Sequence, residues 1–143
     1  MGKAIAQCIL GVLAGLVVMY IVIAGIEYAS HVMYPPPQGL DPKNPANLGA
    51  ILSAAPVAAL AMLAFAWAAG AFAGGWVAAK ISRIWPRTAA IVVALFVLLG
   101  VIGMILIVPD HPTWVAILGI LLPVPMALLG ARLARPKLAA PLS

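Results

Sequence analysis

Long uncharged segments make up most of this chain, and short groups of charged residues and prolines separate them. Residues without a formal charge run through 4–26, 46–79, 88–109 and 112–131. An α-helix of about 20 residues, rising about 1.5 Å per residue, crosses a hydrocarbon layer of about 30 Å. All four runs reach this length, so the pattern predicts four membrane-spanning helices.

The predicted architecture is an all-α membrane protein with a single four-helix transmembrane domain over residues 1–143. We expect two antiparallel hairpins, because a turn as short as "PDHPTW" makes the helices that it joins antiparallel neighbours. The four predicted spans cover about residues 4–33, 48–79, 88–108 and 112–132. The predicted periplasmic loop covers residues 34–47.

Prolines mark the expected helix boundaries. Pro35 should end the first helix near Tyr34, since the residue before a proline is disfavoured in a helix. Pro56 indicates either a kink in the second span or the true start of its membrane segment, and the sequence leaves both open. Pro123 and Pro125 should kink the fourth span.

Composition excludes a water-soluble fold, because 66% of the residues are hydrophobic and only 8% are charged. The net charge of +5 is unevenly distributed. With four spans, Lys43 is the only basic residue on its side, so the positive-inside rule makes the opposite side, with both termini, cytoplasmic. The basic residues on that cytoplasmic side are Lys3, Lys80, Arg83, Arg87, Arg132, Arg135 and Lys137.

The basic residues that flank the spans should attract anionic lipid headgroups rather than nucleic acid. They are Lys80, Arg83, Arg87, Arg132 and Arg135. Cys8 is the only cysteine, so no disulfide can form within the chain. The sequence contains no hydrolase, phosphate-loop or dinucleotide motif, and we therefore expect neither an enzyme nor a cofactor.

Small residues recur at helical spacing in the first two spans. Gly11 and Gly15 form a GxxxG motif, and a longer ladder follows in the second span. The ladder consists of Ala66, Gly70, Gly74 and Ala78. Such faces let helix backbones approach closely in lipid. The pattern leaves open whether they pack within one chain or between subunits.

Both histidines and two of the three acidic residues gather at the predicted periplasmic boundary. Glu27 and Asp110 lie at a similar height above the cytoplasmic basic residues, and His31 follows Glu27 by one helical turn. His111 adjoins Asp110. On the first helix, one polar stripe lies opposite the GxxxG face. Its members are Tyr20, Glu27, His31 and Tyr34.

This cluster has three interpretations. The simplest is solvation at headgroup depth, with Asp110 capping the fourth helix. The second is a protonatable gate or substrate site facing a periplasmic vestibule. The third is a divalent-metal site formed by His31, His111, Glu27 and Asp110. We expect no metal. We expect Glu27 to turn toward the second hairpin and to form a hydrogen bond with a loop or helix-end group, and His31 to brace the proline loop.

Several motifs carry a resemblance over nearly the whole chain. E-x-x-x-H, "YPPPQGLDP", "AGGWVAAKISR", "HPTW" and "LLGARLAR" resemble a group of small, uncharacterised four-span inner-membrane proteins of bacteria. The resemblance implies a location, the bacterial inner (plasma) membrane, and a multi-pass topology with cytoplasmic termini. It implies no activity.

The leading functional hypothesis is action by helix association, as a homo-oligomer or an accessory subunit of a larger membrane complex. Its expected partners are the lipid bilayer, anionic headgroups and other membrane subunits. The alternative is a small-solute or ion transporter with a periplasmic Glu/His gate. A second alternative is a divalent-metal-binding membrane protein.

Overall fold

The computed structural model describes residues 1–108 and 111–135, and all regular structure within them is helical. The elements are α1 (Gly2–Met33), η1 (Pro45–Asn47), α2 (Leu48–Ala54), α3 (Val57–Ile81), α4 (Pro86–Ile107), α5 (Thr113–Leu121) and α6 (Pro123–Ala134). Four helices are long and apolar enough to cross a membrane: α1, α3, α4, and α5 continued by α6. The expected all-helical class with four long apolar helices is confirmed, and it indicates a multi-pass membrane protein.

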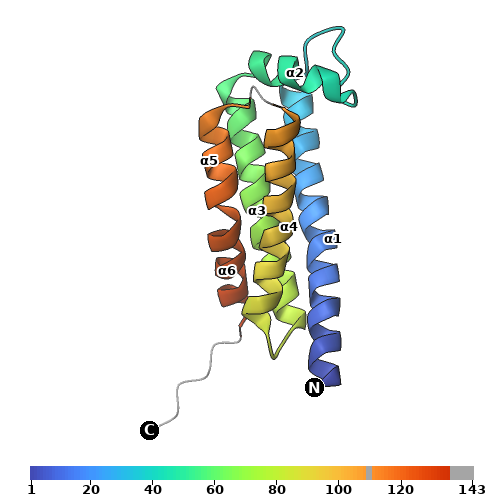
Figure 1. The fold of residues 1–143 in the computed structure, drawn as a ribbon, viewed down its shortest axis with the longest axis vertical. Helices are drawn as coiled ribbons and strands as arrows, with labels where there is room; N and C mark the ends of the chain where they lie inside the picture. The colour runs from blue at the N-terminus through green and yellow to red at the C-terminus, as the bar shows by residue number, and fades with distance from the viewer. Residues whose placement is uncertain (109–110, 136–143) are drawn as a thin grey trace.

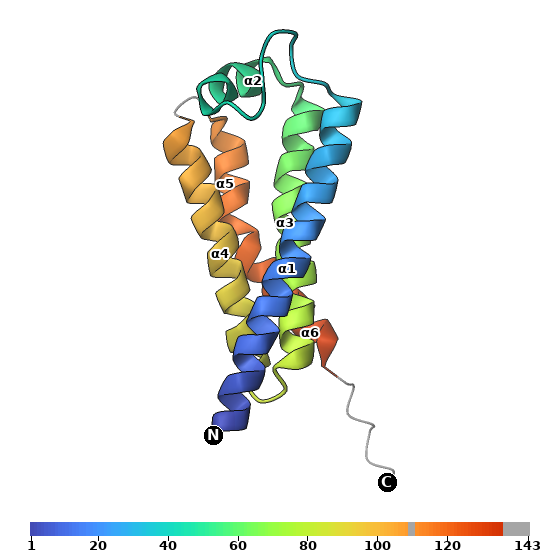
Figure 2. The same cartoon turned by 90° about the vertical axis from the view of Figure 1, so that its right-hand side faces the viewer.

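The long helices stand side by side in an elongated bundle (Figure 1). The N-terminus and the end of α6 lie at one end, whereas α2 lies across the other (Figure 1). Turned by 90°, the bundle separates toward the α2 end into a pair formed by α1 and α3 and a pair formed by α4 and α5 (Figure 2). We call the two ends the terminal end and the α2 end.

The expected second span, residues 48–79, is not one helix. Ala55 adopts an extended conformation with φ −68° and ψ 137°, and Pro56 follows it as the N-cap of α3. A residue before proline is disfavoured in the helix, and proline has no N–H to continue the hydrogen-bond ladder. Of the two possibilities that the sequence left open, Pro56 therefore precedes the true start of the long helix.

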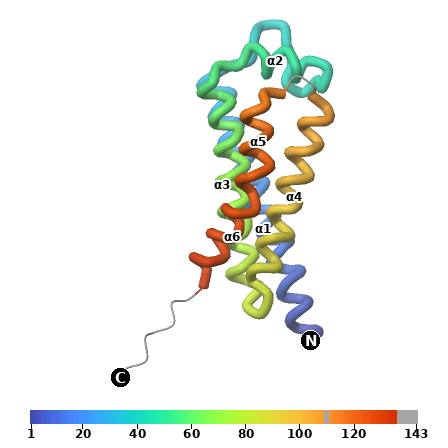
Figure 3. Tube along the Cα trace, turned by 60° about the vertical axis from the view of Figure 1, so that its left-hand side comes forward, coloured from blue at the N-terminus to red at the C-terminus, as the bar shows by residue number. Residues whose placement is uncertain are grey.

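The fourth apolar segment is also interrupted. α5 ends at Leu121 and α6 begins at Pro123, which is buried. Figure 3 shows the chain changing direction between these two helices. The missing N–H of Pro123 breaks the helical hydrogen-bond pattern, and the kink turns α6 across α3, which it contacts.

α3 is the central helix and contacts α1, α4, α5 and α6. The four residues of its predicted small-residue ladder, Ala66, Gly70, Gly74 and Ala78, are buried. A Cβ added to Gly11 would lie 2.7 Å from the carbonyl oxygen of Ala78, so the GxxxG face of α1 packs on this ladder within one chain.

A second close contact, which the sequence reasoning missed, joins α3 to α6. A Cβ added to Gly75 would lie 2.6 Å from the carbonyl oxygen of Ala127, and one added to Gly130 would meet the carbonyl oxygen of Phe72. The signal was present in the spacing of the small residues Ala127, Gly130 and Ala131. The backbones of α3 and α6 therefore approach as closely as those of α3 and α1.

Candidate functional site

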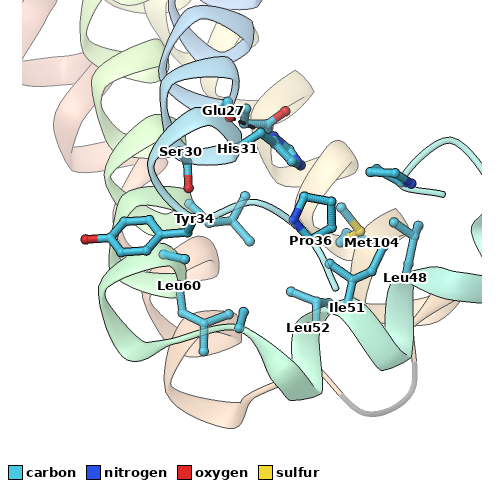
Figure 4. Close-up of a pocket in the computed structure, with 14 residues that line it drawn as sticks. Glu27, Ser30, His31, Tyr34, Pro36, Leu48, Ile51, Leu52, Leu60 and Met104 are labelled. Carbon is cyan, nitrogen blue, oxygen red and sulfur yellow. Dashed lines mark hydrogen bonds between the residues drawn. The ribbon is translucent and has the colours of Figure 1, made fainter. Parts of the chain in front are cut away.

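A pocket of about 360 Å³ lies at the α2 end of the bundle. The last turns of α1, the proline loop, α2, the start of α3 and one side chain of α4 form its walls (Figure 4). Its lining residues are Glu27, Ser30, His31, Tyr34, Pro36, Pro42, Leu48, Ile51, Leu52, Ala55, Ala59, Leu60, Leu63 and Met104.

One wall of the pocket is polar because helical spacing places its residues on one face of α1. Ser30, His31 and Tyr34 follow Glu27 by three, four and seven positions, and residues at this spacing share one face of a helix. The ring of Tyr34 extends to the opposite side of the view from Glu27 and His31 (Figure 4). Glu27, Ser30 and His31 therefore form the polar centre of the pocket.

A hydrogen bond joins the ring of His31 to the backbone of α1. Its Nδ1 lies 2.7 Å from the backbone carbonyl oxygen of Glu27. A carbonyl oxygen only accepts, so Nδ1–H donates, and in the neutral ring Nε2 is then an acceptor. The hydrogen bond also orients the ring of His31, which lines the pocket together with Glu27.

The opposite wall is apolar. α2 contributes Leu48, Ile51 and Leu52, α3 contributes Leu60 among others, and Met104 comes from α4. This wall exists because the chain turns at Pro56 and lays α2 across the end of the bundle. The pocket thus has a polar wall on α1 and, opposite it, an apolar wall formed by α2, α3 and α4.

Among the described residues of the lining, Glu27 is the only acidic one, and none is a lysine or arginine. We expected a hydrogen bond from Glu27 to a group of the second hairpin, but within residues 1–108 and 111–135 its carboxylate accepts none. The reason is that the groups across the pocket are apolar side chains. We expected His31 to brace the proline loop; it lines the pocket together with Pro36 of that loop, and its hydrogen bond goes to α1 itself.

The other predicted members of the polar cluster lie elsewhere. Tyr20 is 70% exposed and does not line the pocket. His111 stacks on Trp67 of α3, with ring centroids 6.1 Å apart and planes inclined by 22°. Asp110 lies outside the described residues. The structure therefore brings Glu27, His31 and Tyr34 together and gives His111 different neighbours.

For a metal site, the described part of the chain offers no group of three or more His, Cys, Asp or Glu side chains close enough to hold an ion. His31 lines the pocket, whereas His111 does not. The structure therefore gives no support, within the described residues, to a metal site formed by His31, His111, Glu27 and Asp110.

At the terminal end, the basic residues expected to meet lipid headgroups separate into different surroundings. Arg87, Arg132 and Arg135 line one groove. The ammonium group of Lys80 lies 5.1 Å from the ring centroid of Trp76. Arg83 is exposed in the turn between α3 and α4. Lys137 falls outside the described residues.

No protein-family model, curated protein or solved structure matches this chain. The resemblance to small four-span inner-membrane proteins of bacteria therefore stays a prediction. A functional assignment depends on the pocket geometry and on the distribution of charge.

Proposed function

We propose that this protein binds, in the pocket at its α2 end, a small amphiphilic molecule that carries a cationic or hydrogen-bond-donating group. The observation that carries the proposal is the pocket itself, whose lining combines the carboxylate of Glu27 and the imidazole of His31 with an apolar wall. Its volume of about 360 Å³ falls in the range of small-molecule sites.

The chemistry of the two walls selects the ligand class. The carboxylate of Glu27 can accept hydrogen bonds and is the one acidic group among the described lining residues, so it favours a donor or a cation. Leu48, Ile51, Leu52 and Met104 favour an apolar body. A strongly anionic solute would meet Glu27 without any basic side chain to balance it.

We place the pocket on the periplasmic side of a bacterial inner membrane. The positive-inside rule puts the basic terminal end, with both chain termini, in the cytoplasm. The four spans then form two antiparallel hairpins, with α2 and the proline loop outside. A ligand would reach the pocket from the periplasm or from the outer leaflet.

Transport of the bound solute is the alternative that this geometry favours next. Glu27 and His31 would then act as the outer gate. Association as a homo-oligomer or an accessory subunit stays a prediction. The small-residue faces of Gly11, Gly15, Gly74 and Ala78 pack inside the chain, so they no longer argue for a partner.

A set of probes with one skeleton and different head groups tests binding. Protein in nanodiscs is dialysed against 4-phenylbutylamine and 4-phenylbutanoic acid, and binding to empty nanodiscs is subtracted. We expect about tenfold tighter binding of the amine, since a hydrogen bond to a charged group contributes about 1.5–3 kcal/mol. Glu27→Gln should abolish this preference, and Ile51→Trp should block both probes.

Asp41→Asn is the matched control, because Asp41 carries the same charge in the neighbouring loop but does not line the pocket. It should keep the preference for the amine. Equal binding of both probes to the unmodified protein, or the same loss in both variants, would refute the proposal. Flux of the amine into proteoliposomes that is unchanged by Glu27→Gln together with His31→Ala would exclude the gate.

A further inference from the structure

A groove at the terminal end lies between the start of α4 and the end of α6. Its lining consists of Arg87 and Ile91 from α4, Leu128 and Arg132 from α6, and Arg135, the C-cap of α6. Figure 3 traces both segments toward the terminal end. Three arginines therefore share one depression with two aliphatic side chains.

The charged and the aliphatic residues of the groove lie at different depths from the terminal end of the bundle. α4 runs away from the terminal end, so Ile91 lies one turn deeper in the bundle than Arg87. α6 runs toward that end, so Leu128 lies one turn deeper than Arg132. Each helix thus contributes a guanidinium at the rim and an aliphatic side chain below it.

Within residues 1–108 and 111–135, no acidic side chain lines the groove with these arginines. The chain contains only three acidic residues. Glu27 lies at the α2 end, Asp41 belongs to the loop at that end, and Asp110 follows the far end of α4 in the sequence. The described lining of the groove is therefore positively charged and contains no acidic side chain.

Arg87 stands in the first turn of α4, where the first turn contains no acidic residue. The amino end of a helix carries partial positive charge, which disfavours a cation and favours an anion. Arg132 and Arg135 add two more positive charges across the groove. An anion placed among the three guanidinium groups would relieve all of these repulsions at once.

We infer that this groove is a binding site for an anionic phospholipid. The three arginines hold the phosphate of the headgroup, because guanidinium groups donate paired hydrogen bonds to phosphate oxygens. The acyl chains lie along Ile91 and Leu128, one turn deeper. A lipid fits better than a soluble phosphate, since the aliphatic floor continues into helices that are apolar enough to cross a membrane. The inference is independent of the ligand proposed for the pocket at the α2 end.

Native mass spectrometry of delipidated protein in mild detergent tests the site, with phosphatidylglycerol and phosphatidylcholine added separately. Phosphatidylglycerol should bind with at least about tenfold higher affinity than phosphatidylcholine. Arg87→Gln together with Arg132→Gln should remove most of this difference. Arg87→Lys with Arg132→Lys should lose part of it, because lysine keeps the charge but not the planar fork.

Lys80→Gln together with Arg83→Gln is the matched control, because it removes two positive charges at the same end but outside the groove. It should change the affinity by less than about twofold. An equal loss in both double glutamine variants would overturn the inference in favour of a diffuse surface charge. Displacement of the lipid by millimolar inorganic phosphate would overturn it in favour of a soluble-phosphate site, as would equal binding of both lipids.

Discussion

Gly15 of α1 and Gly74 of α3 contact each other backbone to backbone. A Cβ added to Gly15 would lie 2.6 Å from the carbonyl oxygen of Gly74, and one added to Gly74 would lie 2.7 Å from the carbonyl oxygen of Gly15. This reciprocal contact sets the position of α1 along α3. Glu27 follows Gly15 by 12 residues, which is about 18 Å of helix, so the same contact determines the height of Glu27 in the pocket.

Gly15→Ala should destabilise the protein by about 1–3 kcal/mol, because the added methyl group meets backbone rather than a side chain that can move. Unfolding by SDS titration in mild detergent measures the change. Gly25→Ala is the control in the same helix, since a Cβ there meets nothing within 4 Å. It should stay within about 0.5 kcal/mol. Equal stability of the two variants would contradict the tight contact between α1 and α3.

Gly75→Ala should loosen α6 from α3, since its added methyl group would meet the backbone of Ala127. The expected loss is again about 1–3 kcal/mol. Faster proteolysis of α6, relative to the unmodified protein in the same nanodiscs, is the direct measurement. Gly100→Ala on α4 is the control, because a Cβ there meets nothing within 4 Å. Identical cleavage rates for both variants would argue against this packing.

His111→Phe should leave stability unchanged or raise it. Phenylalanine keeps the stacking on Trp67, and it removes the Nε2 atom of His111, which is buried without a hydrogen-bond partner among the described residues. His111→Ala should instead lose about 1–2 kcal/mol, because it removes the stacked ring. Thermal unfolding in mild detergent separates these outcomes. Destabilisation by phenylalanine as large as by alanine would indicate a polar role for the ring.

The proposed topology predicts which residues a membrane-impermeant maleimide labels from outside the cell. In a Cys8→Ser background, Gln38→Cys in the proline loop should react in intact cells. Ile84→Cys in the turn between α3 and α4 should react only after the membrane is permeabilised, because the positive-inside rule places that turn in the cytoplasm. The reverse pattern would invert the topology and move the pocket to the cytoplasmic side.

The number and the apolar character of the long helices could be predicted from the sequence. Uncharged runs of bilayer length are a local property of the chain, and hydrogen bonds within a helix satisfy each backbone in lipid without any neighbour. Helical spacing likewise placed Glu27 and His31 on one face. The interruptions at Pro56 and Pro123 were visible too, because proline acts on its own backbone.

The tertiary structure alone decided which faces meet. The small residues Gly11 and Gly15 allow close approach to any helix, and only packing selected Gly74 and Ala78 of the same chain rather than a second subunit. The sequence predicted a similar height for Glu27 and Asp110, with His111 adjoining Asp110, but height does not specify direction around the bundle axis, and His111 stacks on Trp67. The direction of α2 after the loop was equally undetermined, because a break at proline leaves the following segment free to point several ways. The pocket exists because α2 crosses the end of the bundle, and that depends on contacts between residues distant in sequence.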